Sequence, residues 1–189
     1  SFNDVVGMER EKRQRSKSIV WKLANPELYK KYKGKRSKEY NTILLYGPPG
    51  CGKSLIAEAT AGECEKYVKK VYYIPITSSK IKHSLVGESE KKIREVFELA
   101  AKNEPSIMFF DEIEGIGGSR NEENSSVHDK KLVSEFLSCF DILKGKKVLV
   151  IAATNQPFDI DSALRRDGRF GTQIFVDLPD YEARKNLFK

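Results

Sequence analysis

Gly47-Pro48-Pro49-Gly50-Cys51-Gly52-Lys53-Ser54 is the stretch of sequence that decides the fold. It follows an apolar run, Ile43–Tyr46, and precedes a stretch from Leu55 onward that reads as a helix. The spacing Gly-x-x-x-x-Gly-Lys-Ser between a strand and a helix is typical of a loop that cradles phosphates. Small residues let backbone N–H groups converge on phosphate oxygens, and the start of the helix adds partial positive charge. The sequence therefore predicts a phosphate-binding loop rather than a glycine-rich turn with an incidental lysine.

Two side chains of this loop carry distinct chemistry. Lys53 supplies a point charge to the β- and γ-phosphates, and Ser54 offers a hydroxyl to Mg²⁺. Cys51 is expected to be a small buried residue, although a thiol there could make the site sensitive to oxidation. The residues expected to bind the nucleotide here are Pro49, Gly50, Cys51, Gly52, Lys53, Ser54 and Leu55.

A pair of carboxylates ends a second apolar run, Ser106–Phe110. Side chains that follow one another along a strand point in opposite directions, so Asp111 and Glu112 cannot duplicate each other. We expect Asp111 to hold Mg²⁺ through its water shell, and Glu112 to orient and polarise the attacking water. The alternative is that both carboxylates merely solvate a strand end. Glu114 is interpreted as surface charge.

Polar and basic residues follow a third apolar run, Val148–Ala152. An amide at the position of Asn155 can hydrogen-bond both the attacking water and the γ-phosphate, although turn residues often look similar. The arginines Arg165, Arg166 and Arg169 come next. Negative charge develops on the γ-phosphate during phosphoryl transfer, and an arginine supplied from a neighbouring subunit stabilises it. Taken alone, the arginines could equally form salt bridges on a surface helix.

Apolar, β-branched runs alternate with helical stretches, which predicts a layered α/β sandwich with a parallel sheet. The predicted strands are Thr42–Tyr46, Val71–Ile76, Ile107–Phe110, Val148–Ala152 and Ile174–Val176. The predicted helices are Lys53–Lys66, Glu88–Lys102 and Val127–Leu143, and the predicted loops are Lys80–Gly87 and Gly115–Ser126.

The net charge of +7 lies entirely at the start of the chain. Residues 1–40 hold 12 Lys and Arg against 5 Asp and Glu, whereas residues 41–189 hold 22 of each sign. One interpretation is an anionic partner such as nucleic acid, and the other is a solvated lysine-rich loop. We favour the second, with residues 1–40 packing on the core. Three cysteines without metal-ligand spacing and the absence of a membrane-length apolar run predict a cytoplasmic protein.

Together these motifs resemble the large nucleotide-binding subdomain of a classical AAA ATPase, of the valosin-containing-protein-like and archaeal type. The resemblance runs from Phe2-x-Asp4-Val5-Val6-Gly7 to Leu178-Pro179-Asp180. The stretches that carry it are residues 45–54, residues 109–113 (Phe-Phe-Asp-Glu-Ile), residues 152–157 (Ala-Ala-Thr-Asn-Gln-Pro) and residues 165–170 (Arg-Arg-Asp-Gly-Arg-Phe).

The resemblance implies a three-layer αβα sandwich with strand order 5-1-4-3-2, formed by residues 41–189, and binding of ATP or ADP with Mg²⁺. It makes Asn155 the sensor, Arg165 structural, and Arg166 and Arg169 fingers that reach an adjacent protomer. It places Asp4 and Gly7 near adenine. It also implies a homo-hexameric ring that couples ATP hydrolysis to remodelling or threading of a polypeptide.

Some features depart from the family pattern. The pore loop, Leu85-Val86-Gly87, carries Leu85 where an aromatic residue is usual, which makes strong gripping of a substrate uncertain. Ile142 stands where the family commonly has glycine, so signalling between subunits by that stretch is also uncertain. The small helical lid of the family is not among these residues, which leaves the adenine pocket incomplete.

Two other functions fit parts of the sequence. A nucleic-acid-dependent P-loop ATPase is suggested by the basic residues 1–40, and its hydrolysis would be stimulated by DNA rather than by unfolded protein. A scaffold that binds ATP without hydrolysing it would have no need of Lys53, Asp111, Glu112, Asn155 and the arginines together. We therefore expect a protein-remodelling ATPase, with nucleic acid as an unlikely partner.

Overall fold

The computed structural model describes residues 41–68, 70–78, 81, 88–117, 127–166, 169–179, 181, 184 and 185. The strands are β1 (Asn41–Tyr46), β2 (Tyr72–Thr77), β3 (Ser106–Asp111), β4 (Val148–Thr154) and β5 (Gln173–Phe175). The α-helices are α3 (Lys53–Cys64), α5 (Glu88–Lys102), α6 (Glu114–Gly117), α7 (Val127–Cys139) and α8 (Ser162–Arg165). Two 3₁₀-helices, η2 (Phe140–Leu143) and η3 (Pro157–Asp159), flank β4.

The five strands form one parallel sheet in the order β2-β3-β4-β1-β5, which confirms the predicted strand order. β3, β4 and most of β1 are buried, as continuous apolar runs predict for central parallel strands. β2 and β5 lie at the two edges, and several of their side chains are exposed. An apolar run in the sequence therefore does not by itself distinguish these edge strands from the buried central ones.

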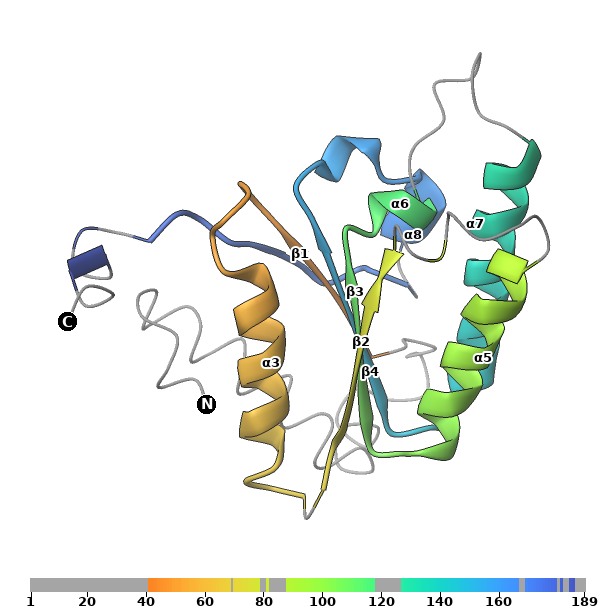
Figure 1. Ribbon diagram of the computed structural model, residues 1–189, viewed down its shortest axis with the longest axis horizontal. Helices are drawn as coiled ribbons and strands as arrows, with labels where there is room; N and C mark the ends of the chain where they lie inside the picture. The colour runs from red at the N-terminus through yellow and green to blue at the C-terminus, as the bar shows by residue number, and fades with distance from the viewer. Residues whose placement is uncertain are drawn as a thin grey trace.

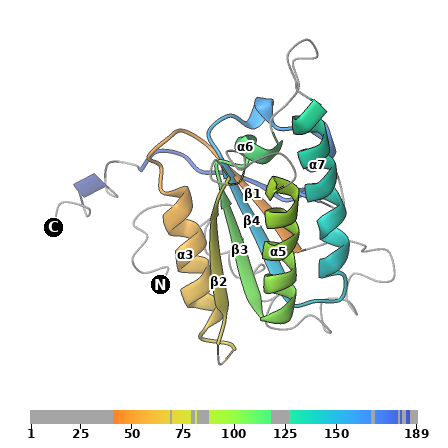
Figure 2. The same ribbon diagram turned by 45° about the vertical axis from the view of Figure 1, so that its right-hand side comes forward.

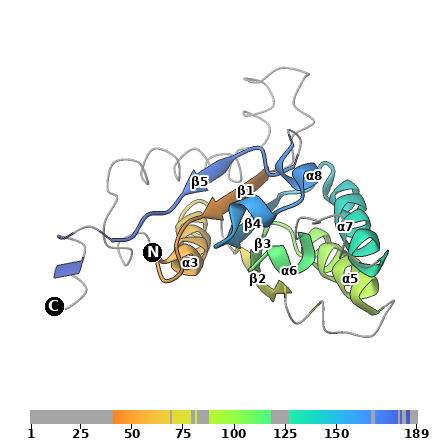
Figure 3. The same cartoon turned by 90° about the horizontal axis from the view of Figure 1, so that it is seen from above.

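Helices cover the sheet on both faces and give three layers (Figures 1 and 2). α3 lies on one face, where its buried side chains join a cluster with the apolar residues of β1, β3 and β4. α5 and α7 lie on the other face, over the larger of the two clusters. Figure 3, the view from above, shows α8 next to α7 and away from α3. The predicted α/β sandwich is therefore confirmed.

Aromatic rings form the centre of the larger cluster. The ring of Phe136 makes edge-on contacts with those of Phe97, Phe110 and Phe140, at centroid distances of 5.5, 5.1 and 5.4 Å. Such edge-to-face pairs place the positive edge of one ring against the negative face of another. The ring of Phe140 also packs edge-on against that of Phe170, at 5.9 Å. The cluster thereby links α5 and α7 to the segment that follows α8.

Two predicted boundaries were wrong. The predicted helix Val127–Leu143 is α-helical only to Cys139 and continues as the 3₁₀-helix η2, a common way for the last turn of a helix to tighten. The predicted loop Gly115–Ser126 begins with helical residues, since α6 extends to Gly117. Residues 118–126 of that loop lie outside the described part, as do residues 1–40 and all of the predicted loop Lys80–Gly87 except Ile81.

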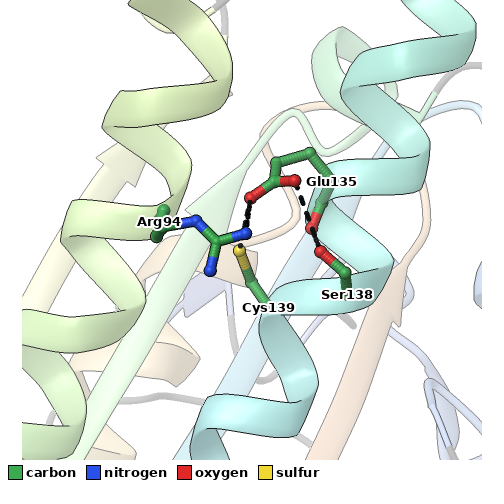
Figure 4. A network of polar contacts seen from close by, with 4 residues as sticks. All are labelled: Arg94, Glu135, Ser138 and Cys139. Carbon is green, nitrogen blue, oxygen red and sulfur yellow. Dashed lines mark hydrogen bonds and ion pairs between the residues drawn. The ribbon is translucent and has the colours of Figure 1, made fainter.

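A polar network ties α5 to α7 (Figure 4). The Arg94 guanidinium pairs with Glu135 Oε1 at 2.5 Å, and Ser138 Oγ donates to the Glu135 backbone carbonyl at 2.8 Å. Cys139 Sγ lies 3.5 Å from the same carboxylate oxygen of Glu135. Burial, with a further contribution from the Glu135 charge, raises the pKa of the Cys139 thiol to about 12. The network is therefore structural, because this thiol stays protonated at neutral pH.

We expect Phe136→Ala to lower the free energy of unfolding by about 3–5 kcal/mol, because it leaves a cavity among rings that are fully buried. Urea denaturation followed by circular dichroism measures the change. Phe158, whose residue surface is 86% exposed, provides the matched control. Phe158→Ala should change stability by less than about 0.5 kcal/mol. Equal losses for the two variants would contradict the assigned core.

Candidate nucleotide site

The phosphate loop begins where β1 ends. Gly47 has a φ of 155°. A Cβ at this position would lie 2.0 Å from the carbonyl oxygen of Val176, so only glycine fits against the segment that follows β5. Gly52, with a φ of 88°, occupies the left-handed region directly before the first residue of α3. Glycine adopts this conformation without strain, and the turn therefore aims the amino end of α3 back toward the loop.

Lys53 lies beneath this loop, and only 8% of its surface is exposed. Its Nζ donates to the carbonyl oxygens of Gly47 and Pro48 at 2.8 and 2.7 Å. Cys51 Sγ lies 3.5 Å from the same nitrogen. Cys51 is half-buried against the cluster on the α3 face, which agrees in part with the expectation of a small buried residue. The loop therefore holds a nearly buried ammonium group at its centre.

The two expected metal ligands lie side by side. Ser54 Oγ donates to Asp111 Oδ2 at 3.4 Å, although the two residues are 57 positions apart in the sequence. The other carboxylate oxygen, Asp111 Oδ1, accepts from the backbone N–H of Glu112 at 3.1 Å. The fold thus brings a hydroxyl and a carboxylate together at the junction of the phosphate loop with the end of β3.

Glu112 departs from the sequence-based expectation. β3 ends at Asp111, and Glu112 has a φ of 52°, in the left-handed region. We predicted that Asp111 and Glu112 point in opposite directions because both belong to a strand. That reason is wrong, since Glu112 lies beyond the strand and the turn sets the direction of its side chain. Two hydrogen bonds stabilise the turn: the N–H of Ile113 donates to the carbonyl of Ala153 at 3.0 Å, and that of Gly115 to the carbonyl of Glu112 at 2.8 Å. The exposed carboxylate of Glu112 thus leaves the sheet on a fixed turn.

Asn155 directly follows β4 and is exposed. The residue before it, Thr154, is buried and uses both of its oxygens. Its carbonyl accepts from the N–H of Gly47 at 3.3 Å, and its Oγ1 accepts from the N–H of Gln156 at 2.9 Å. The first bond ties the end of β4 to the phosphate loop, and the second turns the chain immediately after Asn155.

Two residues of the site were missed from the sequence. The role of Thr154 could have been predicted from the sequence, because a threonine hydroxyl can accept a hydrogen bond from the backbone N–H two residues later and so form a local turn. The position of Tyr73 in β2 could not have been predicted from the sequence, because it depends on how β2 pairs with β3. Burial raises the pKa of the Tyr73 phenol, and the charges of Glu58 and Asp111 raise it further. Its ring stacks against that of Phe109 in β3 at a centroid distance of 6.4 Å and packs against the cluster on the α3 face of the sheet.

The arginines lie at and after α8. The side chain of Asp161 caps this helix by accepting from the N–H of Ala163 at 2.8 Å. Arg166 is exposed, whereas Arg165 and Arg169 are half-buried. Among the described residues the buried Nε of Arg165 has no hydrogen-bond partner, whereas Arg169 Nη1 donates to the carbonyl of Ala163 at 3.0 Å. The three arginines therefore differ sharply in their surroundings.

Several expected site residues cannot be compared with the structure. Asp4, Gly7, Leu85, Val86 and Gly87 all lie outside the described residues. Glu114, expected to be surface charge, is half-buried, and its buried Oε2 has no hydrogen-bond partner in the part of the chain that the structure describes. The three cysteines form no disulfide. None of the helices in the described residues is long and apolar enough to cross a membrane.

Comparison with known proteins supports the geometry. The model of the "ATPase family associated with various cellular activities (AAA)" matches residues 43–178. A cell division cycle protein 48 homolog from Archaeoglobus fulgidus is 41% identical over the whole chain, which covers 25% of that protein. Protein SAV from Sulfolobus acidocaldarius is 39% identical over the whole chain, which covers 23% of it. A third relative, the Arabidopsis thaliana protein SUPPRESSOR OF K(+) TRANSPORT GROWTH DEFECT 1, is 36% identical, and the chain covers 41% of it.

The family match spans the phosphate loop, the acidic end of β3, the end of β4 and the arginines at and after α8. The chain spans about a quarter of the two archaeal relatives. It belongs to the AAA family of ATPases and is a nucleotide-binding ATPase domain of that family.

Proposed function

We propose that this domain binds ATP with Mg²⁺ at the loop between β1 and α3 and hydrolyses it, as one subunit of a homo-hexameric ring that remodels protein substrates. One observation carries the proposal. A nearly buried ammonium group, a hydroxyl and a carboxylate converge at the carboxyl edge of a parallel sheet, where ligands bind in open α/β folds.

Lys53 supports the binding step. Its ammonium group donates to two loop carbonyls, which position it within the loop. A γ-phosphate can compete for this group because a hydrogen bond between two charged partners is stronger than one to a neutral carbonyl. Pro49, Gly50, Cys51, Gly52 and Leu55 are proposed to line the same loop around the phosphates.

Ser54 and Asp111 fit a magnesium ion, which prefers oxygen ligands and is bound by few protein groups together with substrate phosphates and water. When bound, Mg²⁺ neutralises charge on the β- and γ-phosphates. The hydroxyl of Ser54 and the carboxylate of Asp111 would hold it.

Glu112 and Asn155 are proposed to orient the attacking water. The left-handed turn directs the Glu112 carboxylate out of β3 into solvent, where it can accept a proton from water. Asn155 lies one residue beyond the carbonyl that binds Gly47, so its amide belongs to the same edge as the phosphate loop. The hydrogen bond from Ile113 to Ala153 joins the two strand ends that carry these side chains.

The position of the arginines supports action on a neighbouring subunit. Ile160, Leu164 and Phe170, which flank them, belong to the cluster beneath α5 and α7. α3, which begins at the phosphate loop, packs in the cluster on the opposite face of the sheet. An arginine on one side of the sheet is therefore well placed to complete the site of another copy, as a ring assembly requires. We propose Arg166 as this group.

The remaining features of the ring are proposals that rest on the sequence. Asp4 and Gly7 would contact adenine, and Leu85, Val86 and Gly87 would line the pore through which a polypeptide passes. A cytoplasmic location is supported by the three free cysteines, which suit a reducing compartment.

We expect Lys53→Ala to weaken ATP binding on the order of a hundredfold, since it removes the only charge inside the described loop. Isothermal titration of the full-length protein with Mg-ATP measures the affinity. Lys66→Ala, just beyond α3 on the surface, is the matched control and should bind ATP normally. Normal affinity in Lys53→Ala would remove the phosphate loop from the site.

Glu112→Gln should retain ATP binding and lower turnover by about 10²–10⁴-fold, because the amide cannot accept the proton of water. Steady-state phosphate release and nucleotide titration separate the two effects. Glu114→Gln, two residues away, should keep most of the turnover. Undiminished hydrolysis by Glu112→Gln would exclude this carboxylate as the base.

Arg166→Ala should lower turnover by about a thousandfold while each subunit still binds ATP. Mixing it with Lys53→Ala subunits, whose Arg166 is intact, should restore part of the activity. In such mixed rings an intact phosphate loop can face an intact Arg166 of the adjacent subunit. If mixing at any ratio gave no recovery, Arg166 would act only within its own subunit.

A further inference from the structure

The amino ends of three neighbouring strands meet at one edge of the sheet, away from the nucleotide site. β2, β3 and β4 are parallel, and their first residues, Tyr72, Ser106 and Val148, lie side by side in the register. The N–H of Tyr72 donates to the carbonyl of Pro105, and that of Ser106 to the carbonyl of Lys147, both at 3.1 Å. Figure 1 shows β2 beginning at the end of the molecule where α3 finishes, opposite the loop that leads into α3. The residues that precede these strands therefore form one continuous surface, which we call the amino edge.

Lysines outnumber acidic residues at the amino edge. The two residues before each strand are Lys70-Val71, Glu104-Pro105 and Lys146-Lys147. The three lysines and Glu104 are exposed. Three positive charges against one negative charge leave a net charge of +2 on these six residues. The amino edge is therefore a small basic surface on the opposite side of the sheet from Asp111 and Glu112.

The negative charge of Glu104 is already compensated. Its Oε2 accepts from the backbone N–H of Lys147 at 2.7 Å, and its Oε1 accepts from Lys146 Nζ at 3.2 Å. These contacts, the backbone hydrogen bond above all, hold the pKa of Glu104 below its ordinary value. The ammonium group of Lys147, in contrast, forms no ion pair within the described residues. The charges of Lys70 and Lys147 are therefore the ones that a partner can use.

An exposed aromatic ring lies next to Lys70. Lys70 Nζ is 4.5 Å from the centroid of the Tyr72 ring, and Tyr72 is 40% exposed. The face of an aromatic ring attracts a cation, so the ring holds the ammonium group over the start of β2. Val71, between the two, is buried in the cluster on the α3 face and anchors the backbone. Tyrosine is enriched at protein interfaces because its ring has an apolar body and a polar end.

We propose that the amino edge binds an acidic polypeptide segment, with Lys70 and Lys147 contacting its carboxylates and Tyr72 contacting its apolar parts. β2 and β4 are two strand spacings apart, which places the backbones that carry the two lysines on the order of 10 Å from each other. An extended segment rises about 3.3 Å per residue, so carboxylates three positions apart span this distance. The chain also enters this edge at Asn41, directly after residues 1–40, whose charge of +7 adds long-range attraction for an acidic partner.

A polypeptide fits this surface better than nucleic acid does. The planar fork of arginine is the preferred partner of phosphates, whereas the basic residues of the amino edge are all lysines. A continuous phosphate backbone would also have to pass the carboxylate of Glu104, which lies between the other two connections. A polypeptide can instead place its carboxylates opposite Lys70 and Lys147 alone, with a neutral residue opposite Glu104.

Fluorescence anisotropy of labelled peptides added to the full-length protein tests the proposal. The probe is a fluorescein-labelled peptide of Glu-Ser-Ser repeats, and a peptide of Gln-Ser-Ser repeats is its neutral control. We expect the wild type to bind the first peptide saturably and the second not at all. Lys70→Glu/Lys147→Glu should weaken binding of the first peptide by about tenfold or more, because two attractive pairs become repulsive. No saturable binding of the Glu-Ser-Ser peptide, or equal binding of both peptides, would overturn the proposal.

A matched control separates this surface from the overall charge. Lys91→Glu/Lys130→Glu makes the same change of charge at exposed positions of α5 and α7 and should bind the peptide as the wild type does. Both double variants should bind Mg-ATP normally, since neither alters the nucleotide site, and normal binding shows that they fold. If the two double variants lose affinity for the peptide equally, the attraction is general and the amino edge is not its site.

Tyr72 provides a milder and independent test. Tyr72→Phe keeps the ring that attracts Lys70 and should retain affinity within about twofold, whereas Tyr72→Ala should lower it by about two- to fivefold. Unchanged affinity in Tyr72→Ala would contradict the role of the ring.

Fluorescein-labelled oligothymidylate tests the other class of acidic partner. We expect any binding of this single strand to be unaffected by Lys70→Glu/Lys147→Glu. Tighter binding of oligothymidylate than of the Glu-Ser-Ser peptide, lost in that double variant, would assign the amino edge to nucleic acid and overturn the proposal.

Discussion

The last two carbonyls of β4 hold the site together. The carbonyl of Thr154 binds the first residue of the phosphate loop, and the carbonyl of Ala153 binds the backbone just beyond Glu112. Because backbone hydrogen bonds are short and directional, three strand ends are fixed relative to one another at one edge of the sheet. The positions of the groups that we assign to the phosphates, the metal ion and water all depend on this arrangement.

Burial places the charges where they can act. The interior strands β3 and β4 carry no charged side chain until β3 reaches its last residue, Asp111. Lys53 is a charged residue that is nearly buried within the loop. Its burial is tolerated because two carbonyls accept hydrogen bonds from its ammonium group. A buried ammonium group held by neutral partners has a strong preference for an anionic one. This preference is why we assign Lys53 to the phosphates.

The phosphate loop and the arginines belong to opposite faces of the sheet. α3 and the phosphate loop belong to one face, whereas the arginines are anchored in the aromatic cluster of the other. A rigid sheet between them means that a subunit presents its loop and its arginines on different sides. In the ring that we propose, this separation would let the state of one nucleotide affect the adjacent subunit. Phe170 packs against Phe140 of η2 and belongs to the same cluster as the buried residues of α5 and α7.

The sequence by itself determined the phosphate loop, the acidic end of β3 and the alternation of strands and helices, because these depend on residue type and local spacing. The residues that lie outside the described part, such as Asp4 and Leu85, remain predictions. Only the tertiary structure decided that Glu112 leaves β3 through a left-handed turn, that α7 ends at Cys139, and that Arg169 binds the carbonyl of Ala163. Those features depend on hydrogen bonds and packing partners brought together by strand pairing, and no local pattern in the sequence contains them.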